Sequence, residues 1–383
     1  MSLHEVVDHA RVRILSKFMP RRARLLVLSV SLTLALAAVG CTTTRNAAST
    51  SSKVPGTRAG FSPGGAMVWE SDADLARDLN AARLTGAKWV RVEVNWNAIQ
   101  SGGPNWWRWD YLDRMVSALH ARGMRMIGTL AYAPAWARRS SCSGTMTCPP
   151  ANAGAFANFA RVAAARYAPL GVHAWEVWNE PNLPAWWASG TNAADYVALL
   201  KPTYVAIKGA DRYATVVSGG MGPHGDLGAT PNDPQSPINY VKAMYAAGAR
   251  GYFDALGHHP YPPLPHEPLS GKIGWNALLQ TTWLHSIMSS NGDGNKQIWG
   301  TEYGAPTGPA GYSFTVSPNA QAQYIVTGFR YWTSLPYTGP LFVDNIRDAP
   351  TRRSDDWHSN MGLLYQNFGS KPALGAMSSI IQH

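Results

Sequence analysis

The sequence predicts an α/β protein that folds as one (β/α)8 TIM barrel. From about Gly56 to the C-terminus, short β-type runs alternate with amphipathic helical runs eight times, which is the pattern of a parallel barrel. This segment has about 330 residues and no linker or low-complexity tract, a normal length for a barrel with loop insertions. A doubly wound open sheet is the rival fold. It would carry a glycine-rich phosphate loop, but Gly60–Gly65 does not lead directly into a helix.

The expected strands are short β-type runs of four to six residues, and the expected helices between them repeat apolar residues with the helical period. The strands are Arg58–Phe61, Trp89–Val94, Arg125–Leu130, Ala174–Trp178, Thr215–Ser218, Ala255–His258, Gln297–Gly300 and Pro340–Val343. The helices are Asp72–Leu84, Tyr111–Ala121, Ala153–Tyr167, Asp195–Lys208, Ile238–Ala247, Asn276–Met288, Ala320–Trp332 and Pro372–Ile381. In such a barrel, functional residues lie at the carboxyl ends of the strands and on the βα loops.

Residues 1–41 are expected to be an export signal and not part of the fold. A basic patch at residues 21–24 precedes the apolar run Leu25–Val39, whose 15 residues are too short to span a bilayer comfortably. The sequence AVGC that ends at Cys41 resembles a bacterial lipobox. This resemblance implies lipidation of Cys41 and anchoring to the outer face of the cell membrane. Residues 42–55 would then form a flexible tether, and ordinary cleavage with free secretion is the alternative.

The net charge of +10 does not indicate nucleic-acid binding. Residues 1–41 hold six Lys or Arg residues against two acids, so +4 of this charge lies in the expected signal. The remaining +6 is scattered over the chain without a Lys/Arg block. We therefore expect no nucleic-acid partner and interpret the charge as a solvated surface.

Cys142 and Cys148 are the cysteines of the expected domain, and they lie in the segment SSCSGTMTCPP. An exported protein can form disulfides, and this spacing would close a small loop. A metal site is the alternative, but no histidine lies within the loop. We predict a disulfide between Cys142 and Cys148, and we expect no metal and no other cofactor.

Polar and ionisable residues gather where five of the expected strands end. The endings are RVEVNW, AYAPAW, WNEPN, HHPYPP and GTEYG, on the second, third, fourth, sixth and seventh strands. Glu180 and Glu302, 122 positions apart, end the fourth and seventh strands. These strands lie nearly opposite each other across the mouth of a barrel. Two opposed carboxylates are what glycoside hydrolysis requires, since one protonates the leaving oxygen while the other attacks the anomeric carbon or activates water.

WNEPN on the fourth strand together with TEYG on the seventh resembles the retaining glycoside hydrolases of clan A. Arg91 matches the arginine of their second strand, and His259-Pro260-Tyr261 matches the H-x-Y of their sixth strand. The WEVWNEPN run and the APAWA ending are most similar to family 39, with family 5 next. The resemblance covers about residues 56–383 and implies a retaining O-glycosidase that acts on a carbohydrate.

The resemblance also implies roles for the residues of these motifs. Glu180 would be the acid/base, which requires it to carry a proton, and Glu302 would be the nucleophile, which requires it to stay ionised. Arg91 and Tyr261 are the expected hydrogen-bond partners of Glu302. Asn179 would bind the 2-hydroxyl of the sugar. The expected separation of the two carboxyl groups is about 5–5.5 Å, the retaining geometry.

Two departures from family 39 bear on the substrate. Its exo-acting members carry an extra β-rich domain, whereas this sequence stops after its eighth expected helix, and the eighth strand has Phe342 and Val343 where many clan members present a sugar-stacking tryptophan. We therefore expect the compact endoglycosidase type, a single catalytic domain without an accessory β-domain. It would be a monomer that acts on an extracellular or cell-envelope polysaccharide. The alternatives are a non-catalytic glycan-binding lipoprotein, an exo-acting β-xylosidase-like enzyme and a transglycosylase.

Further residues on the expected strand ends and βα loops are candidates for substrate contacts. His259 is expected to form hydrogen bonds there, whereas His258, on the other face of the strand, packs into the wall. Glu176 shares the strand parity of Glu180 but lies about 13 Å deeper. We expect Glu176 to pair with an inward arginine or a buried water and not to act on the substrate. The candidates for sugar stacking are Trp96, Trp136, Trp186 and Trp187.

Overall fold

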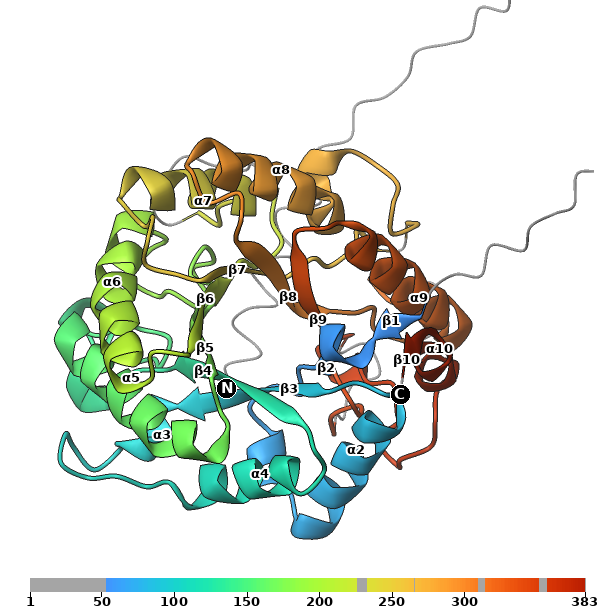
Figure 1. Cartoon of the computed structure of the whole chain (residues 1–383), viewed down its shortest axis with the longest axis horizontal. Coiled ribbons are helices and arrows are strands. Elements are labelled where there is room, and N and C mark those ends of the chain that lie inside the picture. The colour runs from blue at the N-terminus through green and yellow to red at the C-terminus, as the bar shows by residue number, and fades with distance from the viewer. Residues whose placement is uncertain (1–52, 226–232, 265, 309–313, 351–356, 383) are drawn as a thin grey trace, which may run out of the picture. The chain divides into compact units, whose positions relative to one another are not determined.

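The computed structural model, shown in Figure 1, describes residues 53–225, 233–264, 266–308, 314–350 and 357–382. Eight parallel strands close into a barrel in chain order, from β2 to β9. The strands are β2 (Ala59–Phe61), β3 (Trp89–Asn95), β4 (Arg125–Ala131), β5 (Ala174–Asn179), β6 (Thr215–Gly220), β7 (Ala255–His258), β8 (Gln297–Tyr303) and β9 (Thr338–Val343). The predicted (β/α)8 TIM barrel is confirmed.

Each barrel strand is followed by a helix on the outside of the barrel (Figure 1). These helices are α2 (Asp72–Leu84), α4 (Asp110–His120), α5 (Ala153–Tyr167), α6 (Ala193–Ala210), α7 (Pro237–Ala246), α8 (Ala277–Ser290), α9 (Pro318–Ser334) and α10 (Pro372–Ile380). A single-turn helix, α3 (Trp96–Ile99), also follows β3. Side-chain oxygens of Ser71, Asn152 and Asn192 accept backbone hydrogen bonds at the starts of α2, α5 and α6, which satisfies donors that a helix start leaves free.

Most of the predicted elements lie within two residues of their expected bounds, and two larger differences concern strands. The short strands β1 (Val54–Pro55) and β10 (Ile381–Gln382) pair in parallel outside the barrel, and two residues are too few to show a periodicity in the sequence. β8 continues beyond its predicted end, so Glu302 lies within the strand. The pairing of β8 with β9 shifts register between Gly300 and Tyr303, the kind of irregularity that re-aims a side chain beside an active site.

An apolar layer fills part of the barrel interior. Each strand from β3 to β9 contributes one side chain to it, namely Trp89, Ile127, Ala174, Val217, Ala255, Trp299 and Phe342. Two positions further along, β3, β4 and β5 carry Arg91, Thr129 and Glu176. Because side chains alternate along a strand, these polar groups point into the barrel above the apolar layer.

The predicted signal and Cys41 lie outside the described residues, as does most of the tether. Within the described ranges, no helix combines the length and the hydropathy needed to cross a bilayer. Cys142 and Cys148 form the predicted disulfide, in the loop between β4 and α5.

Candidate active site

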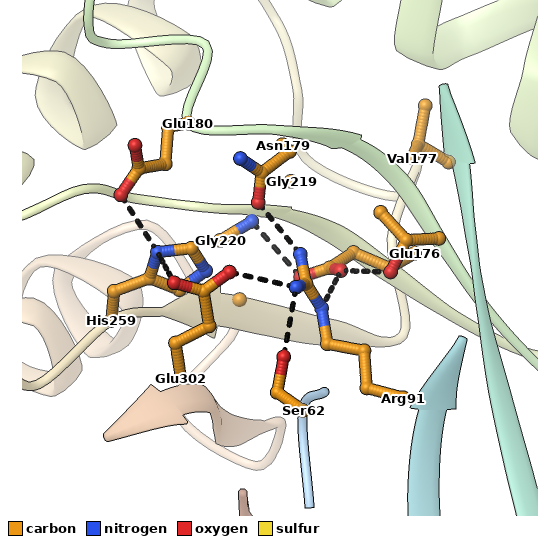
Figure 2. A network of polar contacts seen from close by, with 12 residues as sticks. Ser62, Arg91, Glu176, Val177, Asn179, Glu180, Gly219, Gly220, His259 and Glu302 are labelled. Carbon is orange, nitrogen blue, oxygen red and sulfur yellow. Dashed lines mark hydrogen bonds and ion pairs between the residues drawn. The ribbon is translucent and has the colours of Figure 1, made fainter. Parts of the chain in front are cut away.

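The two glutamates predicted at the strand ends lie together at the carboxyl end of the barrel (Figure 2). One oxygen of Glu180, one oxygen of Glu302 and Nδ1 of His259 all lie within 4.8 Å of one another. Glu180 directly follows β5, and Glu302 belongs to β8. The nearest oxygens of the two carboxyl groups are thus no more than 4.8 Å apart, and the expected retaining geometry places the carboxyl groups about 5–5.5 Å apart.

The backbone turns sharply where β5 delivers Glu180. Trp178 and Glu180 have positive φ angles of 73° and 44°, a left-handed conformation that costs energy in a residue other than glycine and persists where the surroundings enforce it. Here the Glu180 N–H donates to the Gly220 carbonyl of β6 at 3.0 Å. A Cβ atom on Gly222 would lie 2.7 Å from Glu180 Oε1, so the glycine lets the carboxylate approach this backbone.

Glu302 is held as an ionised carboxylate. Arg91 Nη1 donates to its Oε1 at 2.8 Å, and the Tyr261 hydroxyl contacts its Oε2 at 3.0 Å. Burial alone would raise the pKa of Glu302. The positive charges of His259 and Arg91, together with the hydrogen bond from Tyr261, outweigh burial and hold this pKa below its ordinary value. The hydrogen bonds expected from Arg91 and Tyr261 are both present.

Arg91, on β3, connects the WEVWNEPN segment to Glu302 (Figure 2). Its Nε donates to Glu176 Oε2 at 2.6 Å, and its Nη2 donates to Asn179 Oδ1 at 2.7 Å. Glu176 is fully buried and also accepts a hydrogen bond from the Thr129 hydroxyl at 2.8 Å. The expectation that Glu176 pairs with an inward arginine is confirmed, and that arginine is also a partner of Glu302.

His259, directly after β7, lies between the two glutamates. Its Nδ1 is 2.9 Å from Glu180 Oε1 and 3.4 Å from Glu302 Oε2. Burial alone would lower the pKa of His259, but the two carboxylates outweigh burial and raise it above its ordinary value. His258 packs into the wall as predicted, where its Nε2 lies 2.8 Å from the Ala277 carbonyl and burial lowers its pKa to about 4.

Two of the four tryptophans predicted to stack on sugars have accessible rings. Trp136 is 39% exposed, and its Nε1 donates to the Gln100 carbonyl at 2.7 Å. Trp186 is partly exposed and stacks on Tyr132 with 5.8 Å between ring centroids. The loops after β4 and β5 therefore each present one of these tryptophans at least partly at the surface.

The other two tryptophans do not lie at the surface, contrary to the prediction that they stack on sugars. Trp96 and Trp187 are fully buried, so the expectation that they contact substrate is wrong. Trp96 lies in α3 and stacks on Phe159 of α5, with 5.5 Å between ring centroids. Trp187 packs edge-on against Trp178 with 5.3 Å between ring centroids. Both lie after a strand end as predicted, but the backbone there turns their rings back into the core.

Two further carboxyl groups at strand ends were not singled out from the sequence. Glu93, on β3, accepts a hydrogen bond from Asn95 Nδ2 at 2.7 Å, and burial raises its pKa. Asp344 directly follows β9, and its Oδ2 lies 2.6 Å from the Tyr261 hydroxyl oxygen. Burial and the charge of Glu302 raise the pKa of Asp344 to about 7. Both residues lie in strand-end segments, RVEVNW and PLFVDN. They could therefore have been identified, like Glu180, from the rule that functional residues of a barrel lie at the carboxyl ends of its strands.

The atoms that Glu180, His259 and Glu302 bring together could also ligate a cation. Three protein ligands of this kind suit a catalytic zinc ion. However, Arg91 lies 2.8 Å from Glu302 and places a fixed positive charge beside these ligands, which opposes a second cation there. The arrangement fits a carboxylate pair better than a metal centre.

No protein-family model and no curated protein matches this sequence. The structure, however, resembles solved glycoside hydrolases. A family 39 glycoside hydrolase from Bacteroides cellulosilyticus WH2 superposes with a TM-score of 0.66 and 22% sequence identity, covering 85% of this chain and 63% of that chain. This chain thus spans less than two thirds of the length of the Bacteroides protein.

Two further solved structures show the same likeness. A monomeric β-xylosidase from Caulobacter crescentus CB15 superposes with a TM-score of 0.62 and 15% identity, over 85% of this chain and 68% of that chain. A GH5_18 protein from Bifidobacterium longum subsp. infantis superposes with a TM-score of 0.61 and 16% identity, over 85% of this chain and 78% of that chain. The chain therefore shares the (β/α)8 fold of these glycoside hydrolases, and the expected resemblance to clan A, with family 39 first and family 5 next, is confirmed at the level of the fold.

Proposed function

We propose that this chain is a retaining O-glycoside hydrolase that cleaves a polysaccharide by double displacement. The observation that carries the proposal is the pair Glu180 and Glu302, which present oxygens within 4.8 Å of each other at the carboxyl end of the barrel. An inverting enzyme needs wider spacing, because a water molecule must fit beside its base. The fold shared with family 39 glycoside hydrolases supports the same chemistry.

In the first step, Glu302 attacks the anomeric carbon while Glu180 gives its proton to the leaving oxygen. The lowered pKa of Glu302 keeps this nucleophile ionised. The attack forms a glycosyl ester and removes the negative charge of Glu302. The positive charge of Arg91 is still balanced at that stage, because the carboxylate of Glu176 lies 2.6 Å from its Nε.

In the second step, Glu180 is ionised and takes a proton from the water that attacks the anomeric carbon, which frees Glu302. His259 Nδ1, 2.9 Å from Glu180, stabilises Glu180 in this ionised form. Asn179 accepts from Arg91 through Oδ1 at 2.7 Å, which leaves its Nδ2 to donate to the 2-hydroxyl of the sugar. That hydrogen bond strengthens as the oxocarbenium-like transition state forms.

We further propose that cleavage occurs within the polysaccharide chain. Exposed aromatic side chains, on which sugar rings can stack, are present on six of the βα loops. They are Trp69, Trp106, Trp136, Trp275, Phe314 and Tyr365. Several stacking positions suit a substrate longer than one sugar. Sizing the products of a digested envelope polysaccharide should show oligosaccharides, whereas monosaccharides alone would indicate an exo-acting β-xylosidase-like enzyme.

The enzyme is proposed to act outside the cell, anchored through a lipid on Cys41 to the outer face of the membrane. The basic patch, the apolar run and the cysteine that follows it support export with lipidation. The disulfide between Cys142 and Cys148 supports an oxidising compartment. Cys41→Ala should move the protein from the membrane fraction to the soluble fraction. An unchanged distribution would contradict the anchor.

A panel of aryl glycosides tests the hydrolase proposal directly. The wild type should release the aryl group from at least one sugar, and Glu302→Ala should lose release by a factor on the order of 10⁴. Added azide should restore release from an activated aryl glycoside, because it replaces the missing carboxylate as nucleophile. Glu267→Ala, which removes an exposed carboxylate between β7 and α8, should behave as the wild type. Glycan binding without turnover in the wild type would favour a non-catalytic glycan-binding protein.

A further inference from the structure

The end of β9 carries a carboxyl group that the two-glutamate mechanism does not use. Asp344 directly follows β9, and its N–H donates to the Tyr303 carbonyl of β8 at 2.8 Å, so it lies beside the strand that carries Glu302. Its Oδ2 lies 2.6 Å from the Tyr261 hydroxyl oxygen. Among the described residues, no Lys, Arg or His side chain forms an ion pair with Asp344.

Tyr261 lies between two carboxyl groups but has only one hydroxyl proton. Its oxygen is 3.0 Å from Glu302 Oε2 and 2.6 Å from Asp344 Oδ2. The phenol can donate to one of these oxygens. The other contact needs a second proton, because two unprotonated oxygens at this distance would repel each other. Burial, reinforced by the charge of Glu302, raises the pKa of Tyr261 well above its ordinary value, so the phenol keeps its own proton.

The surroundings decide which carboxyl group carries the second proton. The charged or titratable groups that face Asp344 are Tyr261 and His259 after β7, Glu302 on β8 and Arg91 on β3. Arg91 and His259 lie 2.8 Å and 3.4 Å from Glu302 and stabilise its ionised form. Asp344 faces the negative charge of Glu302 without a cation at ion-pair distance. The second proton therefore belongs on Asp344.

We propose that Asp344 is a positioning residue that stays protonated in the resting enzyme and donates this proton to the Tyr261 oxygen, which in turn donates to Glu302. The two hydrogen bonds fix the direction of the phenol proton toward the nucleophile. When Asp344 ionises, Tyr261 donates to Asp344 instead, and Glu302 loses one donor. The effect on rate rests on the proposed hydrolase function, whereas the location of the proton does not.

The kinetic test isolates the attack by Glu302. A 2,4-dinitrophenyl glycoside of the sugar that the aryl panel identifies needs no proton from Glu180, so the first burst of dinitrophenolate reports on Glu302 and its partners. In the wild type the burst rate should fall as the pH rises through about 7. The fall in burst rate above about pH 7 is the alkaline limb of the pH profile. Asp344→Asn keeps a neutral N–H donor for Tyr261, so this variant should lack the alkaline limb and keep the wild-type burst rate at low pH. Asp344→Leu removes the donor and should slow the burst about tenfold.

The proton on Asp344 is observed without any substrate by infrared difference spectroscopy. At about pH 5, where ordinary aspartates are ionised, the wild type should show the C=O band of a neutral carboxyl group that Asp344→Asn lacks. The band should disappear at about pH 9. Absence of the band at the lower pH would overturn the proposal, whatever the activity. A band that is present together with an unchanged alkaline limb in Asp344→Asn would overturn the positioning role.

Glu70 offers a matched control. Burial and the neighbouring Asp78 raise the pKa of Glu70 to about 7, but its partner is Arg347, at 2.7 Å, outside the Tyr261 network. Glu70→Gln should lose a carboxyl band that titrates in the same range and should keep the alkaline limb of the burst rate. Loss of the limb in Glu70→Gln as well would assign it to a general response of the fold and overturn the role of Asp344.

Discussion

Two layers of side chains fill the interior of the same barrel, and the same strands supply both. β3 to β9 supply an apolar layer that includes Trp89, Trp299 and Phe342. Toward the carboxyl ends, β3 supplies Arg91 and β5 supplies Glu176, which pair at 2.6 Å. Contact alone stabilises the apolar layer, whereas each charged group above it must find a partner to offset its lost hydration.

Within this one barrel, the apolar layer contributes to stability alone, whereas the polar layer also supports the proposed reaction. Glu176 is fully buried against Arg91, and Arg91 directs its remaining donors toward Glu302 and Asn179. The polar layer is thus partly structural and partly a support for the proposed nucleophile. Changes in the apolar layer should alter the free energy of unfolding and spare the reaction, whereas changes in the polar layer should alter both.

The largest effect is expected from Glu180→Gln, at the top of the polar layer. This change removes the proposed acid, so kcat/KM for a glycoside with a poor leaving group should fall about 10²–10⁴-fold. A dinitrophenyl glycoside needs no such proton and should lose far less. The two substrates are compared with the same enzyme preparation. Equal losses for both leaving groups would contradict the acid role of Glu180.

Glu176→Gln tests the part of the polar layer that supports the site. The change removes the charge that balances Arg91 in the buried pair, and breaking such a pair costs about 3–5 kcal/mol. The free energy of unfolding, from denaturant titration, should fall by that amount. The kcat should fall as well, because Arg91 is then attracted by Glu302 alone. A loss of stability with unchanged kcat would contradict a role of Glu176 in the reaction and leave it a structural role alone.

Phe342→Ala is the matched change in the apolar layer. Phe342 is fully buried, and truncating a buried phenylalanine costs about 3–5 kcal/mol of unfolding free energy. At a temperature where the variant is folded, its kcat should stay close to that of the wild type. A folded Phe342→Ala variant with a large loss of kcat would contradict the separation of the two layers.

The smallest effect on the reaction is expected from a change at His258, because this residue packs into the barrel wall and does not reach the glutamates. Its contribution is to the pH dependence of stability. Burial lowers its pKa from the ordinary 6.5 to about 4. Between these values the unfolded chain binds a proton that the folded chain does not, so the free energy of unfolding should fall as the pH drops from about 6.5 to about 4. His258→Asn can still donate to the Ala277 carbonyl and should weaken this dependence. Identical pH slopes for the two proteins would exclude His258 as the cause.

The barrel and its glutamate pair were predictable from the sequence because both depend on local patterns. The alternation of strand and helix determines the closed sheet, and the sheet brings strand ends together irrespective of their separation along the chain. Glu180 and Glu302 could therefore be paired across 122 residues. The depth of Glu176 followed from its position within β5, and this depth predicted its pairing with an inward arginine such as Arg91.

Whether the loop side chains are buried or exposed was not predictable from the sequence, because it depends on tertiary packing. Trp96, Trp136 and Trp187 all lie shortly after strand ends, yet Trp136 is exposed whereas Trp96 and Trp187 are buried. Which way each ring turns depends on neighbours such as Phe159, which come from other parts of the chain. The contact between Tyr261 and Asp344 likewise joins two strand ends, and no local pattern relates their side chains.

If Glu180 and Glu302 act as a retaining pair, the first product keeps the anomeric configuration of the substrate. Proton NMR follows the anomeric signal while the enzyme hydrolyses an aryl glycoside, before mutarotation mixes the anomers. The first sugar released should have the same anomeric configuration as the substrate. A first product with the inverted configuration would contradict the assignment of Glu302 as the nucleophile.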